Sequence, residues 1–166
     1  CSTGEEPYSI AIWLLENWPM VDAYHIEIVG SDIDTQVLLD AQAGNYSERA
    51  LSRLPADVIG RYFEAARDGE RRLIRDLRES VKFTSANLVD TGSVAAQGHF
   101  DIIFCRNVLP LLVEPMRVRL LDNLARALTP GGYLFLGQDE SVAGLSNAFQ
   151  PLATAGLYAR DPAVRV

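Results

Sequence analysis

The side chains best suited to chemistry in this sequence are polar residues that follow apolar runs. Asp32, Asn87, Arg106 and Asn107 each stand shortly after such a run. A carboxylate can accept two hydrogen bonds from a diol, so Asp32 could bind the hydroxyl groups of a ribose. Alternatively, Asp32 or Asp34 caps the helix that follows. The spacing of these residues from the strand and the helix fits ribose binding and helix capping equally well.

Cysteine and histidine, which often supply a nucleophile or a general base, are scarce. Cys1 and Cys105 are the only cysteines, and their spacing fits neither a disulfide framework nor a metal site. Cys105 has no base near it in the sequence, so we expect a small buried side chain rather than a nucleophile. His25 and His99 precede predicted strands and are expected at the surface or in the core. Arg106 is either a structural ion-pair partner or a ligand for a carboxylate.

Alternating helices and strands must position these residues. Apolar runs predict strands covered on both faces at 25–31, 81–83, 100–105 and 132–137, with a final strand at 157–160. Helices are predicted at 6–18, from Asp34 or Thr35 to 43, at 55–66 and at 114–128. This alternation predicts an α/β fold with a parallel sheet, in which ligands bind beyond the carboxyl ends of the strands.

Local signals add detail to this prediction. The hydroxyl groups of Ser2 and Thr3 are expected to cap the first helix, and its apolar run 10–15 predicts that the helix is mostly buried. The segment 129–132, Thr-Pro-Gly-Gly, predicts a turn. The polar, arginine-rich stretch 45–80 predicts an inserted subdomain, and 1–44 together with 81–166 then form the main domain.

Charge and composition narrow the possible partners. The 166 residues carry 15 Lys and Arg against 22 Asp and Glu, a net charge of −7. This balance argues against nucleic acid and anionic membranes as partners. No apolar run reaches the roughly 20 residues that a membrane-spanning helix needs, so no direct membrane insertion is expected. The scarcity of cysteine favours a cytoplasmic setting, although a mature bacterial lipoprotein also begins with cysteine.

Several motifs occur together in an order that resembles the CheR family of chemotaxis receptor methyltransferases. The resemblance runs from Cys1 to about Tyr158. The most specific motifs are the segment 1–9, Cys-Ser-Thr-Gly-Glu-Glu-Pro-Tyr-Ser, and the segment 104–108, Phe-Cys-Arg-Asn-Val. The remaining motifs are 31–34 (Ser-Asp-Ile-Asp), 87–88 (Asn-Leu) and 128–132 (Leu-Thr-Pro-Gly-Gly).

The resemblance implies a Rossmann-like class I methyltransferase sheet and an S-adenosylmethionine-dependent protein-glutamate O-methyltransferase. Such an enzyme forms γ-glutamyl methyl esters on the cytoplasmic domain of methyl-accepting chemotaxis receptors, in sensory adaptation, and releases S-adenosylhomocysteine. By motif position, Arg106 would face the substrate carboxylate. The cofactor would contact Ser2, Thr3, Gly4 and Glu5 at its amino-acid end, Asp32 at the ribose, Asn87 and Leu88 at the adenine, and Asn107 and Val108 near the reacting centre.

The chemistry of this reaction is compatible with so few histidines. A sulfonium donor is already activated, and a glutamate with a pKa of about 4.3 is ionised at neutral pH, so no general base is required. The site must instead supply an in-line approach and a dry pocket.

The chain departs from the family pattern at three places. Leu111 stands where the family usually has a tyrosine beside the reacting methyl group. The segment 137–140, Gly-Gln-Asp-Glu, replaces a Gly-His-Ser-Glu motif, which is a milder change. The first sheet strand and the N-terminal helical domain of the family are missing from this sequence, so we expect the natural protein to extend upstream.

Two alternatives and one surface feature stay open at this point. Leu111 suggests a degenerate S-adenosylmethionine-binding regulatory or scaffolding module, and Asp32 alone is compatible with an unrelated nucleotide-binding enzyme. A cluster of arginines is either a solvated face or a contact surface for an acidic receptor: Arg71, Arg72, Arg75 and Arg78.

Overall fold

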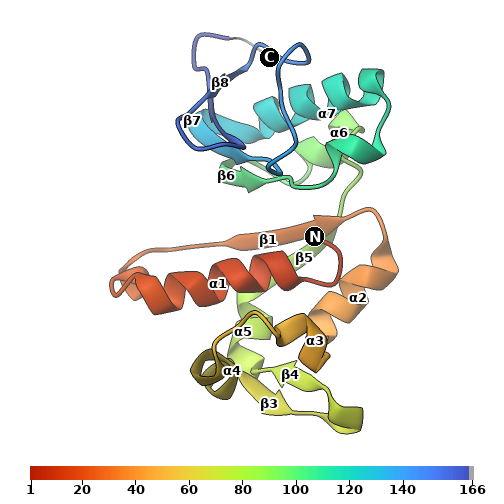
Figure 1. Cartoon of the computed structure of the whole chain (residues 1–166). Coiled ribbons are helices and arrows are strands. Elements are labelled where there is room, and N and C mark those ends of the chain that lie inside the picture. Colours follow the sequence, from red (N-terminus) through yellow and green to blue (C-terminus); the bar gives the residue numbers. More distant parts are fainter. Residues whose placement is uncertain (165–166) are drawn as a thin grey trace. The chain divides into compact units, whose positions relative to one another are not determined.

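The structure is a computed structural model that describes residues 1–164. The backbone divides into two compact units, Cys1–Ser85 and Ala86–Val166 (Figure 1). Each unit contains a pair of parallel strands with helices packed against it, as the predicted α/β fold requires. The division into a main domain and an inserted subdomain remains a prediction.

The first unit is built on a parallel pair of strands, β1 (Ile28–Asp32) and β5 (Val81–Ser85). Figure 1 shows helix α1 (Glu5–Asn17) running alongside this pair, and helix α2 (Thr35–Ala43) also packs against it. The 3₁₀ turn η1 (Val21–Ala23) joins α1 to β1. The buried side chains of this unit form one cluster, with these members among them: Tyr8, Ala11, Ile12, Tyr46, Leu73, Leu77 and Val81.

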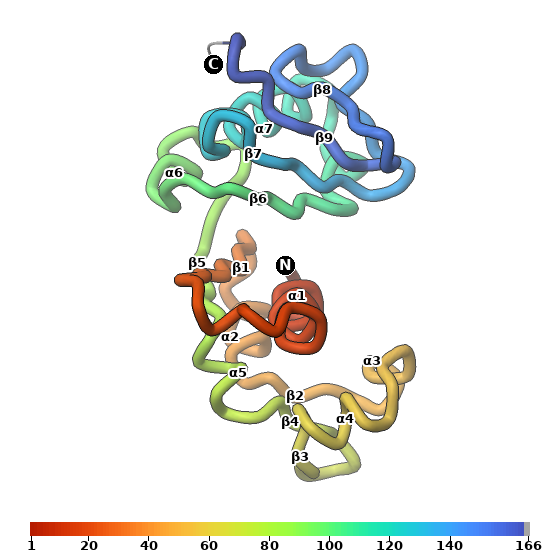
Figure 2. The backbone as a smooth tube through the Cα atoms, turned by 90° about the vertical axis from the view of Figure 1, so that its left-hand side faces the viewer, coloured from red at the N-terminus to blue at the C-terminus, as the bar shows by residue number. Residues whose placement is uncertain are grey.

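A small antiparallel sheet occupies the stretch in which the subdomain is predicted. Its strand order is β2-β4-β3, and Figure 2 shows the helices α3 and α4 beside it. The elements are β2 (Asn45–Tyr46), α3 (Glu48–Leu51), α4 (Ala56–Tyr62), β3 (Phe63–Ala65), η2 (Arg67–Gly69), β4 (Arg71–Leu73) and α5 (Arg75–Ser80). The helix predicted at 55–66 therefore ends early, because Phe63 leaves the helical conformation and begins to pair with β4.

The second unit holds a four-stranded sheet in the order β6-β7-β9-β8, which can be followed in Figure 2. Strand β6 is parallel to β7, and β9 is antiparallel to both of its neighbours. The elements are α6 (Thr91–Ala95), β6 (Phe100–Phe104), η3 (Leu109–Leu111), α7 (Glu114–Ala127), β7 (Leu128–Phe135), β8 (Phe149–Pro151) and β9 (Leu157–Arg160). Helix α7 buries Leu120, Leu121 and Leu124 against this sheet.

Two predictions about α1 are wrong. Trp13 is 61% exposed and Leu15 is 43% exposed, because only the face of α1 that carries Tyr8 and Ile12 packs against the unit. The helix is also not capped by a hydroxyl group: Gly4 occupies the cap position, and no side chain caps the helix there.

Two predictions about the second sheet also need correction. Strand β6 is not covered on both faces, since Ile102 and Phe104 are 50% and 39% exposed on this edge strand. The turn predicted at 129–132 is an irregularity inside β7. The pairing of β7 shifts there, from Phe100 opposite Leu128 to Ile102 opposite Tyr133.

No helix within residues 1–164 is long and apolar enough to cross a membrane.

Candidate functional site

In the first unit, the turn at residues 1–4 is bound to the carboxyl end of β1 through Asp32. The Asp32 Oδ2 atom accepts hydrogen bonds from the nitrogens of Ser2 (2.9 Å) and Cys1 (3.1 Å), and Oδ1 accepts one from the Asp34 nitrogen (3.1 Å). Partial burial alone would raise the pKa of Asp32, but hydrogen bonds, above all those from the Ser2 and Asp34 nitrogens, hold the pKa below its usual value. Asp32 is therefore ionised at neutral pH.

Of the two aspartates that could cap the following helix, the structure assigns this role to Asp34. Asp34 occupies the cap position of α2, where its side chain accepts a hydrogen bond from the Gln36 nitrogen at 2.8 Å. The Asp32 carboxylate accepts from Asp34 and from the turn at residues 1–4 instead. The ribose role predicted for Asp32 stays a prediction.

Gly4 allows this turn to lie close to the core of the first unit. Its φ angle of +88° lies in the left-handed region, and a Cβ atom there would be 3.0 Å from the Ala41 Cβ and 3.2 Å from the Tyr46 hydroxyl. That hydroxyl donates a hydrogen bond to the Thr3 carbonyl at 2.8 Å. Burial, with a smaller contribution from the Glu5 carboxylate, raises the pKa of Tyr46 well above its usual value, so Tyr46 stays a donor.

Thr3 and Glu5 lie at an open polar cleft in the same unit. The Thr3 hydroxyl donates to the Glu5 carboxylate at 2.8 Å. The cleft has a volume of about 420 Å³ and is lined by Thr3, Glu5, Asp40, Ala43, Asn45, Tyr46, Ser47, Ala50 and Glu70. Five of the predicted site residues therefore lie together in the first unit, four of them consecutive and the fifth hydrogen-bonded to Ser2: Ser2, Thr3, Gly4, Glu5 and Asp32.

Asn87 and Leu88 lie at the start of the second unit, just after β5, in a turn held by hydrogen bonds. The Asn87 side chain accepts a hydrogen bond from the Val89 nitrogen at 3.2 Å, and the Leu88 carbonyl accepts one from the Asn123 amide at 2.9 Å. Asn123 lies on α7 and is buried, so it ties the Asn87–Leu88 turn to the core of the unit.

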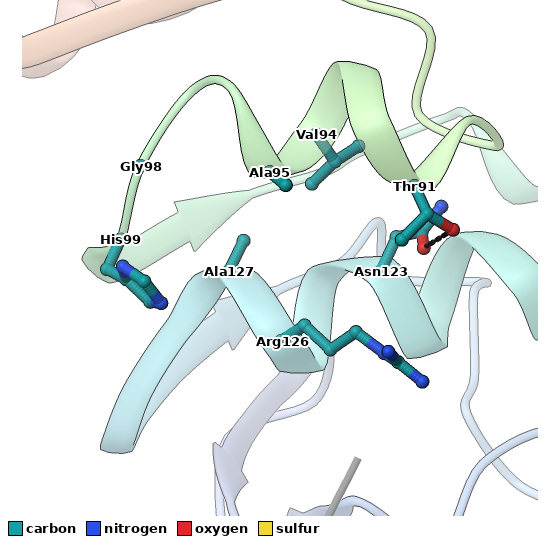
Figure 3. Close-up of a pocket in the computed structure, with 8 residues that line it drawn as sticks. All are labelled: Thr91, Val94, Ala95, Gly98, His99, Asn123, Arg126 and Ala127. Carbon is teal, nitrogen blue, oxygen red and sulfur yellow. Dashed lines mark hydrogen bonds between the residues drawn. The ribbon is translucent and has the colours of Figure 1, made fainter.

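A small cavity lies beside Asn123, between α6 and α7 (Figure 3). Its volume is about 120 Å³, and its lining includes the Thr91 hydroxyl, which donates to the Asn123 side-chain oxygen at 2.9 Å. None of the predicted site residues lines this cavity: its residues are Thr91, Val94, Ala95, Gly98, His99, Asn123, Arg126 and Ala127.

The prediction that His25 and His99 lie at the surface or in the core holds, since both are exposed.

Arg106, Asn107 and Val108 follow β6 in the order that the sequence predicts. Arg106 and Asn107 are exposed, and Asn107 has a left-handed φ angle of +61°. Val108 is partly buried and packs on the same apolar cluster as Leu88. Cys105 is 4% exposed, which confirms its prediction as a small buried side chain.

Glu140 is a residue of this region to which the sequence analysis assigned no role of its own. It is 7% exposed, and its carboxylate accepts hydrogen bonds from the main-chain nitrogens of Asn107 (2.7 Å), Leu109 (2.9 Å) and Gly137 (2.5 Å). Its only signal in the sequence is its place in the segment 137–140, directly after a strand.

The arginine cluster is largely engaged within the first unit. Arg72 and Arg78 donate to the carbonyl oxygens of Ala43 and Leu73, at 3.2 Å and 3.0 Å. Arg75 pairs with Glu79 at 2.6 Å, and this pairing raises the pKa of Arg75. These contacts favour a structural, solvated face for the cluster.

Comparison with known proteins agrees with the resemblance inferred from the sequence. Residues 1–156 match the family described as "CheR methyltransferase, SAM binding domain". A protein from Vibrio cholerae named "Chemotaxis protein methyltransferase 2" is 44% identical, over 90% of this chain and 52% of that protein. A protein of the same name from Pseudomonas aeruginosa is 40% identical, over 88% of this chain and 52% of that protein. The chain thus spans about half the length of these relatives.

Solved structures agree with the fold class. The rRNA methyltransferase AviRa from Streptomyces viridochromogenes aligns with a TM-score of 0.51 and 16% identity, over 98% of this chain and 74% of that chain. At this identity, the likeness concerns the fold alone. The predicted Rossmann-like α/β class is thus confirmed, and the family description confirms S-adenosylmethionine as the cofactor.

Proposed function

The chain belongs to the CheR methyltransferase family, and we propose from this premise that it transfers a methyl group from S-adenosylmethionine to glutamate side chains of chemotaxis receptors. The products are a γ-glutamyl methyl ester and S-adenosylhomocysteine. The acceptor lies on the cytoplasmic domain of the receptor, so the reaction takes place in the cytoplasm. The alternative of an unrelated nucleotide-binding enzyme is ruled out by the family match.

One observation carries the cofactor part of this proposal: the turn at residues 1–4 holds an ionised Asp32 at the carboxyl end of β1. Ligands of α/β sheets bind beyond the carboxyl ends of the strands. The Oδ1 atom of Asp32 accepts one main-chain hydrogen bond, from Asp34. A carboxylate oxygen has two acceptor positions, so Oδ1 can also accept a hydrogen bond from a ribose hydroxyl.

The other predicted cofactor residues offer suitable groups. Ser2, Thr3 and Gly4 form the turn that binds Asp32 through the Ser2 nitrogen, and the Glu5 carboxylate can accept from the amino group of the methionine portion. Asn87 and Leu88 offer a polar and an apolar surface for an adenine ring. Asn107 and Val108 are proposed to line the cofactor near its sulfur, as in the family pattern.

Methyl transfer itself needs no proton movement. S-adenosylmethionine would supply a methyl group on a sulfonium, and its transfer to a substrate carboxylate oxygen would leave the electron pair of the carbon–sulfur bond on sulfur, as a neutral thioether. Donor and acceptor charges cancel as the methyl group moves, so the step is favoured in a dry site. Arg106 is proposed to orient the attacking carboxylate, because a guanidinium can form two parallel hydrogen bonds to it.

The proposal is tested by incubating the intact protein with methyl-labelled S-adenosylmethionine and a receptor cytoplasmic fragment. We expect label on receptor glutamates that is released by mild alkali, as an ester requires. Arg106→Lys keeps the charge but loses the planar fork, so kcat/KM for the receptor should fall by about tenfold to a hundredfold.

Arg126→Lys is the matched control, since Arg126 is exposed on α7 and lines the small cavity of Figure 3 rather than the proposed site. It should leave the rate unchanged. A wild-type protein that binds the cofactor but labels no receptor would contradict the proposed reaction.

A second candidate function rests on Leu111. This residue is 80% exposed in the turn η3, at the position where the family usually has a tyrosine. A regulatory or scaffolding module that binds S-adenosylmethionine without efficient methyl transfer would have no need for that hydroxyl group.

A further inference from the structure

We propose that Glu140 is a positioning residue for methyl transfer: its carboxylate fixes the segment Arg106–Leu109, which carries the proposed substrate and cofactor contacts. This inference rests on the proposed function. Glu140 itself is not expected to touch either substrate, because it is 7% exposed and both of its carboxylate oxygens already accept hydrogen bonds from main-chain nitrogens.

The contacts of Glu140 join the two segments that follow the parallel strands β6 and β7. Oε2 accepts from the nitrogens of Asn107 (2.7 Å) and Gly137 (2.5 Å), and Oε1 accepts from the nitrogen of Leu109 (2.9 Å). The Glu140 nitrogen also donates to the Gly137 carbonyl at 3.0 Å, which closes a tight turn. One side chain therefore supplies acceptors for three nitrogens at the end of the sheet.

We call the three main-chain hydrogen bonds to Glu140 the Glu140 clamp. The backbone conformation of Asn107 shows why this clamp is needed. Its φ angle of +61° is unusual for a residue other than glycine, although asparagine tolerates it better than most. The surrounding structure has to hold a residue in this conformation. The hydrogen bond from the Asn107 nitrogen to Glu140 contributes to this, and in this proposal it fixes the main chain from which the Arg106 and Asn107 side chains extend.

Gly137 provides independent evidence that this arrangement is built into the sequence. A Cβ atom at residue 137 would lie 2.6 Å from Glu140 Oε2 and 3.1 Å from Asn107 Oδ1. Only glycine leaves room for both side chains, although its own φ angle is not in the left-handed region. Gly137, Glu140 and Asn107 therefore act as one packed unit.

The chemistry of the clamp distinguishes glutamate from glutamine. Three N–H donors face the two oxygens, two at Oε2 and one at Oε1. A glutamine has one oxygen and one NH₂ group, so in either orientation its NH₂ faces at least one main-chain donor. Glu140→Gln thus keeps the size of the side chain but removes at least one of these hydrogen bonds.

The test measures methyl transfer to a receptor fragment by the intact Glu140→Gln protein. We expect kcat to fall by about tenfold to a hundredfold, because small displacements of a positioned group cost this much. The KM for the receptor fragment should change far less than kcat. Glu114→Gln is the matched control: Glu114 is exposed at the start of α7, and the same change there should leave kcat unaltered.

Gly137→Ala probes the same unit from the other side, with Glu140 intact. It should lower kcat as well, and the double variant should be little worse than either single one, since both disturb the same contacts. Fully additive losses in the double variant would contradict the proposal. If Glu140 has a purely structural role, Glu140→Gln should instead lower the melting temperature and leave kcat of the folded fraction at the wild-type value. That result would overturn the proposal.

Amide hydrogen exchange of the wild-type protein covers the case in which Glu140→Gln does not fold. The Asn107 and Leu109 amides should be protected although Asn107 lies outside the helices and strands and Leu109 is the first residue of η3, and rapid exchange at both would contradict the hydrogen bonds to Glu140. A wild-type protein without methyl transfer would instead contradict the proposed function. Wild-type activity with unchanged kcat in Glu140→Gln would contradict this inference alone.

Discussion

Tyr8 illustrates how a single buried side chain couples the stability of the first unit to pH. It is 2% exposed and donates a hydrogen bond to the Ala41 carbonyl at 3.0 Å. Burial, opposed weakly by the charge of Arg78, raises the pKa of Tyr8 to about 12. The folded protein therefore retains this proton at a pH where the unfolded chain releases it.

The first prediction concerns Tyr8→Phe and alkaline pH. Below about pH 10 the variant should be less stable by about 1 kcal/mol, the usual net value of a hydrogen bond. A raised pKa gives stability that is complete below the unfolded value of 10.0 and is lost as the pH rises toward about 12. The difference between wild type and variant in urea unfolding should therefore shrink over this range. A constant difference would contradict the raised pKa.

The second prediction concerns Leu111→Tyr, which restores the hydroxyl group of the family pattern. An active enzyme should gain less than about tenfold in kcat, or about 1.4 kcal/mol in the activation barrier. Leu111→Phe separates the effect of the ring from that of the hydroxyl group. A much larger gain for tyrosine alone, with unchanged affinity for S-adenosylhomocysteine, would favour the degenerate module instead.

Single residues were predictable from the sequence to different degrees. The burial of Cys105 followed from its apolar run, and a cap at Asp34 or Asp32 followed from its position before a helix. The choice between the two aspartates did not, because it depends on the main-chain nitrogen of Ser2, which is distant in the sequence. The role of Glu140 could not be assigned from the sequence for the same reason, since its donors at Asn107 and Leu109 lie about thirty residues away.

At the scale of elements, long periodic segments were predicted well. Helices α2 and α7 occur where their caps and apolar spacing place them, and β9 occurs as predicted. The small antiparallel sheet was missed because β2, β3 and β4 have only two or three residues each. Strands this short carry no periodic pattern, and their pairing is decided by long-range contacts.

Strand β7 also shows where local signals mislead. The segment Thr129–Gly132 has the composition of a turn, and Gly131 indeed has a left-handed φ angle of +78°. The chain nevertheless continues in the strand after a shift of register against β6. A Cβ atom at Gly132 would lie 2.9 Å from the Asp101 carbonyl, so the irregularity needs glycine for close approach.

The third prediction concerns Leu134 in β7, which is fully buried in the core of the second unit. Leu134→Ala should lower the free energy of unfolding of that unit by about 2–5 kcal/mol through lost burial and the cavity left behind. Leu111→Ala, at an 80% exposed position, should change it by less than about 0.5 kcal/mol. Urea unfolding measures both, and equal effects would contradict the assigned core.

At the scale of the whole molecule, the family and the α/β class were predictable because they rest on motifs spread along most of the chain. Residues 1–156 match the family, so the resemblance does not depend on any single motif. The site residues divide between the two units, from Ser2 to Asp32 in the first and from Asn87 to Val108 in the second. Their roles toward the cofactor remain predictions.

The most direct test of the account is calorimetric titration of S-adenosylhomocysteine into the intact protein, compared with Asp32→Ala. The account predicts one-to-one binding by the wild-type protein and a loss of about tenfold or more in affinity for the folded variant, since its carboxylate no longer accepts from the ribose. Asp22→Ala, which removes an exposed carboxylate in η1, should bind like the wild type. No binding by the folded wild-type protein, or equal binding by Asp32→Ala, would contradict the account.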